Sequence, residues 1–245
     1  MESKQNINSD PGATQFGNFI NYYDFNTVEQ RTSKIVDIPE SFWNFVLDPY
    51  IVLDVGCNCG DLTEKLYEIL SGEARRNVVV LGIDIDESLI KRAESKTKKN
   101  QNLIFKCIDI MNVNHLKYVN DFLESYNRKK FDAVFCLSIT MWIHLNHSDE
   151  GLRNFLKTVS LKSKLLIVEP QSWESYGKAV RRMKRANYID AFPNYKTLKW
   201  KSDIKIQINE YLQNNCNKVK VLETTATKWG RVLYFYKETQ NLMLS

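Results

Sequence analysis

Apolar residues along the chain fall into short continuous runs that are separated by segments of helical spacing. Continuous apolar runs predict buried strands at residues 50–56, 78–84, 103–110, 131–139 and 164–170. Between and after them, apolar residues recur every three or four positions, which predicts helices at 61–72, 87–100, 115–127, 150–162 and 175–189. The pattern ends with an expected helix at 203–215 and two strands, 218–225 and 231–237, that form a hairpin.

Strands that alternate with helices predict a parallel sheet covered by helices on both faces. Five such units followed by an antiparallel hairpin resemble the class I S-adenosylmethionine-dependent methyltransferase fold, an α/β fold with a mostly parallel seven-stranded sheet. We expect one domain over residues 16–245 and disorder in residues 1–15. Residues 16–47 are rich in Phe, Tyr and Trp, so we expect this N-terminal aromatic arm to pack onto the domain.

The loop after the first predicted strand, DVGCNCGDL, has the spacing of a cofactor loop. The dinucleotide pattern G-x-G-x-x-G fits it poorly, whereas the methyltransferase pattern acidic-x-G-x-G-x-G fits with one departure, at Asn58. Gly56 and Gly60 allow the backbone to pass close to a ligand. Asn58 tolerates unusual backbone angles and offers an amide that could bind the cofactor's amino-acid moiety.

Further candidate cofactor residues stand where later strands are expected to end, and ligands of open α/β sheets bind at those ends. Asp84 is placed to accept hydrogen bonds from ribose hydroxyls, and Asp109 from an adenine amino group. Ile110 would lie beside the adenine ring, and Leu137 against the cofactor. Each aspartate alone could equally be a helix N-cap or a turn residue, but the ordered set predicts S-adenosylmethionine.

The cysteines do not indicate a metal or redox site. Cys57 and Cys59 are closer in sequence than the ligands of structural zinc sites, and the three histidines do not supply a matching pattern. We interpret the two cysteines as small side chains in a tight turn and expect no metal. All five cysteines are expected to be reduced thiols.

Composition and charge are those of a globular protein with an uneven charge distribution. The chain is 43% hydrophobic, and it lacks both an apolar run of membrane-spanning length and a secretory signal. We therefore expect an intracellular protein, in the cytoplasm or alternatively the nucleus, and a monomer by default. Residues 1–150 carry a net charge of −6 and residues 151–245 one of +11. The count alone favours a solvated surface, but it also suits a polyanionic partner.

Several longer motifs resemble the bicoid-interacting-protein family of RNA 5′-phosphate methyltransferases, over residues 16–237. These motifs are FGNFINYYDF, EQR, LDVGCNCGDL, GIDID, KRAE, SITMWIHLNHSDEGL and VEPQSWESYGKAVRRMKR. The resemblance implies that S-adenosylmethionine is contacted by Arg31, Asn58, Asp84, Asp109, Ile110 and Leu137.

Within the family, SITMWIHLNH resembles the branch that methylates 5′-monophosphates of small RNAs, including histidine tRNA and precursor microRNA. The pair Tyr22-Tyr23 instead matches the branch that caps the γ-phosphate of a noncoding RNA. Capping of a γ-phosphate is therefore the alternative to methylation of a 5′-monophosphate. A catalytically silent RNA chaperone is a third possibility, disfavoured by the presence of Arg31, Asn58 and Asp84.

Methyl transfer to a phosphate makes modest chemical demands. A phosphate monoester has a second pKa of about 6, so at neutral pH it is a nucleophilic dianion that needs positioning rather than a strong base. Tyr22, Tyr23 and His144 are candidate donors near the reacting phosphate. The alternatives are that the tyrosines only pack the arm, and that His144 is a buried hydrogen-bonding residue beneath the site.

The predicted helix after EPQSW is a candidate RNA-binding element. Lys178, Arg181, Arg182 and Arg185 are spaced to fall on one helix face. Together with the family resemblance, this spacing favours binding of RNA phosphates over a merely solvated face. Trp173 could stack on a terminal base or belong to the core.

Overall fold

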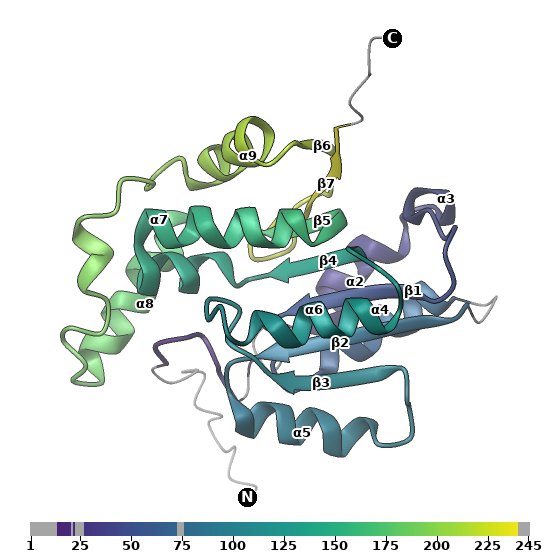
Figure 1. Ribbon diagram of the computed structural model, residues 1–245. Coiled ribbons are helices and arrows are strands. Elements are labelled where there is room, and N and C mark those ends of the chain that lie inside the picture. The colour runs from purple at the N-terminus through teal and green to yellow at the C-terminus, as the bar shows by residue number, and fades with distance from the viewer. Residues whose placement is uncertain (1–13, 21, 23–26, 73–75, 240–245) are drawn as a thin grey trace, which may run out of the picture.

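The computed structural model describes residues 14–20, 22, 27–72 and 76–239 (Figure 1). The segment expected to be disordered, residues 1–15, lies outside these residues except for Thr14 and Gln15. Gln15 is attached to the domain, because its carbonyl accepts a hydrogen bond from Asn146 Nδ2 at 2.9 Å.

A seven-stranded sheet forms the centre of the fold, in the order β3-β2-β1-β4-β5-β7-β6. Its strands are β1 Tyr50–Val55, β2 Val78–Asp84, β3 Leu103–Cys107, β4 Phe131–Leu137, β5 Ser163–Glu169, β6 Lys218–Glu223 and β7 Tyr234–Glu238. The first five strands are parallel, and β7 runs antiparallel between β5 and β6. The predicted fold class, a mostly parallel sheet that ends in an antiparallel hairpin, is confirmed.

Helices cover both faces of the sheet (Figure 1). One apolar cluster contains residues of α2 Val28–Val36, α3 Glu40–Trp43, α4 Asp61–Ser71 and α5 Glu87–Thr97. The other contains residues of α6 Leu116–Ser125, α7 Thr140–Leu161, α8 Trp173–Arg185 and α9 Ile204–Asn215. Because side chains alternate along a strand, Ile51 and Leu53 of β1 join the second cluster, while Tyr50 and Val52 join the first.

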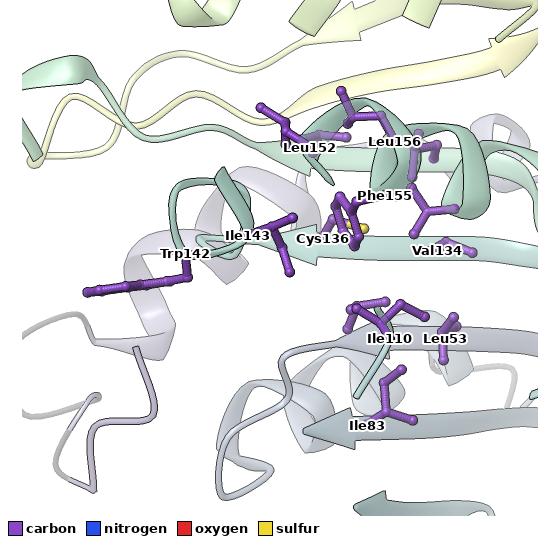
Figure 2. Close-up of a cluster of buried hydrophobic side chains, with 14 of the residues drawn as sticks. Leu53, Ile83, Ile110, Val134, Cys136, Trp142, Ile143, Leu152, Phe155 and Leu156 are labelled. Atoms are coloured by element: carbon purple, nitrogen blue, oxygen red, sulfur yellow. The ribbon is translucent and has the colours of Figure 1, made fainter. Parts of the chain in front are cut away.

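Helix α7 is longer than the sequence pattern predicts. It begins at Thr140, ten residues before the expected start at 150, and kinks at Ser148, where φ is 63° and ψ is −177°. Its first turns are buried without interruption from Met141 to Leu145, so they lack the amphipathic spacing that would indicate a helix. Figure 2 shows Phe155 of the second half of α7 with Val134 and Cys136 of β4, in the core.

The strand order places a binding site where β1 and β4 lie side by side. The connections that leave these strands lead to α4 on one face and α7 on the other, which opens a crevice at their carboxyl ends. The two loops are in close contact there, since a Cβ built on Gly56 would lie 3.1 Å from Ile139 Cδ1.

The turn before α4 depends on glycine at position 60. Gly60 has a φ of 84°, and a Cβ there would lie 2.9 Å from the Phe105 ring and 3.1 Å from Ala93 Cβ. We expect Gly60→Ala to lower the free energy of unfolding by about 2–4 kcal/mol, from left-handed strain plus overpacking. Gly230 also has a positive φ, 70°, but nothing lies within 4 Å of its Cβ position. Gly230→Ala should therefore lose only the strain, about 1–2 kcal/mol. Equal losses in urea titrations of the two variants would contradict this account of the turn.

Candidate active site

A pocket opens at the carboxyl ends of β1, β2 and β4, and it contains all but one of the predicted cofactor residues. Those that line it are Arg31, Gly56, Asn58, Asp84, Asp109, Ile110 and Leu137. Gly60 is not in its lining, because it is the N-cap of α4 and faces Phe105 and Ala93. Gly60 therefore shapes the loop, whereas Gly56 borders the pocket.

Asn58 holds the loop and the N-terminal arm together. Its backbone φ is 52°, in the left-handed region that asparagine tolerates. Its Nδ2 donates to the carbonyl of Phe19 at 2.9 Å, and its Oδ1 accepts from the Cys59 amide at 2.8 Å. The side-chain amide that we expected to bind the cofactor is thus bonded within the protein.

Buried carboxylates form the floor of the pocket. Asp84 Oδ2 accepts from the Asn58 amide at 2.9 Å and Oδ1 from the Asp86 amide at 3.0 Å. Burial raises the pKa of Asp84, although these amides oppose the shift. Burial also raises the pKa of Asp54 to about 6, against a hydrogen bond of 2.6 Å from Thr63 Oγ1. The floor therefore offers acceptors for hydroxyl groups and a negative potential for a cation.

Asp109 and its neighbours form the side of the pocket next to β3. Asp109 lies two residues beyond β3, which ends at Cys107, earlier than predicted. Its Oδ1 accepts from the Met111 amide at 2.8 Å, and its own amide donates to His115 Nδ1 at 3.1 Å. Ile110 is buried beside it and adds an apolar surface. This combination suits a flat heterocycle with an amino group.

Arg31 is buried in an ion pair that the sequence did not reveal. Its Nη2 lies 2.9 Å from Glu169 Oε2, and its Nε donates to Glu169 Oε1 at 3.0 Å. Nη2 also donates to the Tyr22 hydroxyl and to Ser138 Oγ, both at 2.7 Å. Burial alone would lower the pKa of Arg31, but Tyr22 and Glu169 raise it by more than burial lowers it. The net pKa is raised, so the guanidinium stays charged. The only sequence signal for Glu169 is an acidic residue at the end of a predicted strand.

A second pocket adjoins the first. It is lined by Phe19, Tyr22, Ser138, Met141, Trp142, Gln171, Ser175, Lys178, Ala179, Arg182, Trp229 and Arg231. The two pockets share Tyr22, Ser138 and Trp142. Three cations line the second pocket, and no carboxylate does among the residues that the structure describes. The pocket is therefore suited to an anion. Sequence reasoning missed Arg231 and Trp229, which lie in the connection between β6 and β7.

The basic helix α8 is divided between pocket and solvent. Lys178 and Arg182 are four residues apart and line the second pocket, although Lys178 is also exposed. Arg181 and Arg185 are exposed and line neither pocket. Trp173 does not line a pocket either, because it stacks on Tyr195 with ring centroids 5.1 Å apart. Trp173 packs against the core while staying partly buried, and its stacking on an RNA base stays a prediction. Tyr23 lies outside the described residues.

His144 is not placed for direct catalysis. It is fully buried and lines neither pocket. Nδ1 lies 3.1 Å from the Tyr176 hydroxyl and Nε2 lies 3.1 Å from Asp149 Oδ1, while burial lowers the pKa of the ring. These contacts are those expected of the buried hydrogen-bonding residue of the alternative interpretation, and the catalytic role of His144 stays a prediction without a contact to either pocket. Tyr22, the other catalytic candidate, lies at the junction of the pockets.

The two cysteines of the cofactor loop are buried free thiols. Burial raises the pKa of Cys57 and of Cys59, so both stay protonated at neutral pH. Cys59 Sγ donates to Asp61 Oδ2 at 2.8 Å. In the described part of the chain, no group of three or more His, Cys, Asp or Glu side chains is arranged to hold a metal. No helix there is long and apolar enough to cross a membrane.

Comparisons with known proteins extend these observations. Residues 131–238 match the family model of bicoid-interacting protein 3 (Bin3), and residues 53–161 match a methyltransferase domain. The RNA 5′-monophosphate methyltransferase of Bos taurus is 37% identical over 94% of this chain and 83% of its own. The pre-miRNA 5′-monophosphate methyltransferase of Danio rerio is 34% identical over 93% of both chains.

Two further proteins are less similar in sequence. The U6 snRNA methylphosphate capping enzyme Amus of Drosophila melanogaster is 31% identical over 81% of this chain and 64% of its own. The solved structure of the plantazolicin methyltransferase BpumL in complex with SAH superimposes with a TM-score of 0.55 at 15% identity. It covers 89% of this chain and 88% of its own. The architecture is therefore that of a methyltransferase.

The raised pKa of Asp54 predicts a pH-dependent stability. Its folded-state pKa, about 6, lies above the usual 3.8, so its protonation stabilises the fold at low pH, and this contribution is lost as the pH rises through 6. Asp54→Asn keeps an acceptor for Thr63 but does not titrate. We expect the variant to gain about 1–2 kcal/mol of unfolding free energy relative to wild type between pH 5 and pH 8. Urea denaturation across this range measures the gain, and a difference that does not vary with pH would contradict the assignment.

Proposed function

The chain belongs to the bicoid-interacting protein 3 family of RNA 5′-phosphate methyltransferases, and from this premise we propose that it methylates the 5′-monophosphate of small RNAs with S-adenosylmethionine as donor. One observation carries the proposal. A pocket with a carboxylate floor and a pocket lined by cations meet at Tyr22, Ser138 and Trp142. A cationic methyl donor and an anionic acceptor could approach each other at this junction.

The residues of the first pocket fit the proposed cofactor, which supplies an electrophilic methyl group on a sulfonium. Asp84 offers acceptors to the ribose hydroxyls. Asp109 offers an acceptor to the adenine amino group, and Ile110 offers an apolar surface to the adenine ring. Gly56 lets the loop pass close to Ile139 at the edge of the pocket, because a Cβ there would lie 3.1 Å from Ile139 Cδ1. Asn58 acts by tying Phe19 to that loop, and Arg31 acts by fixing Tyr22 and Ser138 at the junction.

The second pocket supplies what a phosphate acceptor needs. A phosphate dianion is already nucleophilic, so the protein must hold it in line with the methyl group and need not deprotonate it. Lys178 and Arg182 contribute positive charge from α8, and neutral Tyr22 and Ser138 lie between the pockets. His144 has no part in this proposal.

The relatives favour a monophosphate over a triphosphate acceptor. The Bos taurus and Danio rerio proteins, both named for 5′-monophosphate methylation, match over more of their length and at higher identity than the Drosophila capping enzyme. Capping of a γ-phosphate remains the alternative, and the same assay separates the two.

The test uses RNAs of one sequence that carry a 5′-hydroxyl, a 5′-monophosphate or a 5′-triphosphate, incubated with labelled S-adenosylmethionine. We expect label on the monophosphate RNA, and we expect phosphatase treatment before the reaction to abolish it. Preferential labelling of the triphosphate RNA would support capping instead. Equal labelling of the hydroxyl RNA would refute methylation of a 5′-phosphate.

A first mutation tests the cofactor assignment. Asp84→Ala removes the pocket's hydroxyl acceptor and should weaken S-adenosylhomocysteine binding roughly 10- to 100-fold, as expected for loss of a charged hydrogen-bonding partner. Isothermal titration calorimetry measures the change. Asp121→Ala removes a half-exposed carboxylate of α6 that lines neither pocket, and it should leave the affinity unchanged. Equal effects of the two substitutions would contradict the assignment.

A second test compares two pairs of cations on α8. The double variant Lys178→Gln, Arg182→Gln changes residues that line the second pocket, and Arg181→Gln, Arg185→Gln makes the same charge change outside it. We expect substitution of the first pair to weaken RNA binding more. It should also reduce the slope of log affinity against log salt concentration by roughly 0.7 per lost phosphate contact. Neither pair should change S-adenosylhomocysteine affinity. A larger loss from the exposed pair would mean that RNA lies over the outer face of α8.

A further inference from the structure

The connection between β6 and β7 brings two side chains, Trp229 and Arg231, to the second pocket. A tight turn fixes the backbone there. The Thr227 amide donates to the carbonyl of Arg231 at 2.7 Å, and the Arg231 amide donates to Thr227 Oγ1 at 3.1 Å. The Arg31 guanidinium lies over the Trp229 ring, with Arg31 Cζ 5.5 Å from the ring centroid. The position of Arg231 is thus set by the fold.

The guanidinium of Arg231 is held at the junction of the two pockets. Its Nη1 donates to Ser138 Oγ at 3.3 Å. Ser138 is itself fixed, because its Oγ accepts from Arg31 and donates to Glu169, and its backbone has a φ of 56°. Ser138 lines both pockets, so Arg231 lies at the border where donor and acceptor would meet.

The charge on Arg231 is not compensated in the way that the charge on Arg31 is. Glu169 neutralises Arg31 through an ion pair in which both side chains are buried. Lys178 pairs with Glu174 at 2.7 Å on the exposed side of α8. By contrast, no carboxylate among the described residues lines the second pocket, so an anion held between Arg231 and the cations of α8 would meet a positive potential.

We propose that Arg231 binds the 5′-phosphate of the RNA directly and that it distinguishes a phosphorylated 5′ end from a 5′-hydroxyl. This inference deepens the proposed function and rests on it. Arg231 comes from the β6–β7 connection and Arg182 from α8, so a phosphate between them contacts cations of two separate elements. The planar guanidinium of Arg231 can donate two parallel hydrogen bonds to one phosphate group.

The experiment measures RNA binding with S-adenosylhomocysteine present, using matched RNAs with a 5′-monophosphate or a 5′-hydroxyl. The ratio of the two affinities isolates recognition of the phosphate. We expect Arg231→Gln to lower this ratio by about 10- to 100-fold, the range of a charge-assisted hydrogen bond. Affinity for the hydroxyl RNA and for S-adenosylhomocysteine should not change. Arg231→Lys should retain part of the ratio, because it keeps the charge but not the bidentate geometry.

Matched controls make the outcome decisive. Arg185→Gln removes an exposed cation that lines neither pocket and should leave the ratio intact. An unchanged ratio in Arg231→Gln would overturn the assignment. So would an equal loss of affinity for both RNAs, which would show a structural or nonspecific effect. Arg231→Lys covers the case in which the Gln variant does not fold. A Lys variant that binds the monophosphate RNA and the hydroxyl RNA with equal affinity would overturn the assignment too. Wild-type protein that binds both RNAs with equal affinity and methylates neither would instead refute the proposed function.

Discussion

The buried ion pair between Arg31 and Glu169 connects the parts of the site. Arg31 belongs to α2, which covers one face of the sheet, and Glu169 ends β5. Removing one partner of such a pair leaves a buried charge uncompensated, at a cost of about 3–5 kcal/mol. The pair is hydrogen-bonded further to Tyr22 and Ser138, so the arm and the end of β4 are held by the same guanidinium. Both pockets depend on it, because Tyr22 and Ser138 line both.

Much of the fold was predictable from sequence, because its signals are local. Buried parallel strands appear as continuous apolar runs, and the loop glycines and strand-end aspartates follow them directly. The start of α7 was not predictable in this way, since a fully buried helix turn loses its amphipathic spacing. The strand ends were also expected too late: β3 stops at Cys107 and β4 at Leu137, so Asp109 lies in a loop rather than at a strand end.

The parts of the site that sequence reasoning missed or misplaced depend on long-range contacts. Arg31 was implied by the family resemblance, but its partner Glu169 is 138 positions away, and no local pattern joins them. Arg231 reaches Ser138 across 93 positions. His144 stands in a distinctive motif, yet its neighbours Tyr176 and Asp149 place it in the core. A distinctive motif therefore does not indicate which of its side chains line a pocket and which are buried in the core.

The charge distribution of the whole chain follows the division between the two pockets. The acidic first part of the sequence contributes Asp54, Asp84 and Asp109 to the first pocket, and the basic last part contributes Lys178, Arg182 and Arg231 to the second. Pockets of opposite potential that lie side by side partly cancel each other's field unless neutral side chains form the boundary between them. Tyr22, Ser138 and Trp142 form that boundary. Methyl transfer from a sulfonium to a phosphate reduces the charge on both reactants, so binding that favours the charged reactants over the products opposes the reaction. Compensation of Arg31 by Glu169 limits this effect, because the pair supplies a rigid hydrogen-bond donor at the boundary without adding net charge there, whereas Arg231 at the same border keeps its charge for the acceptor.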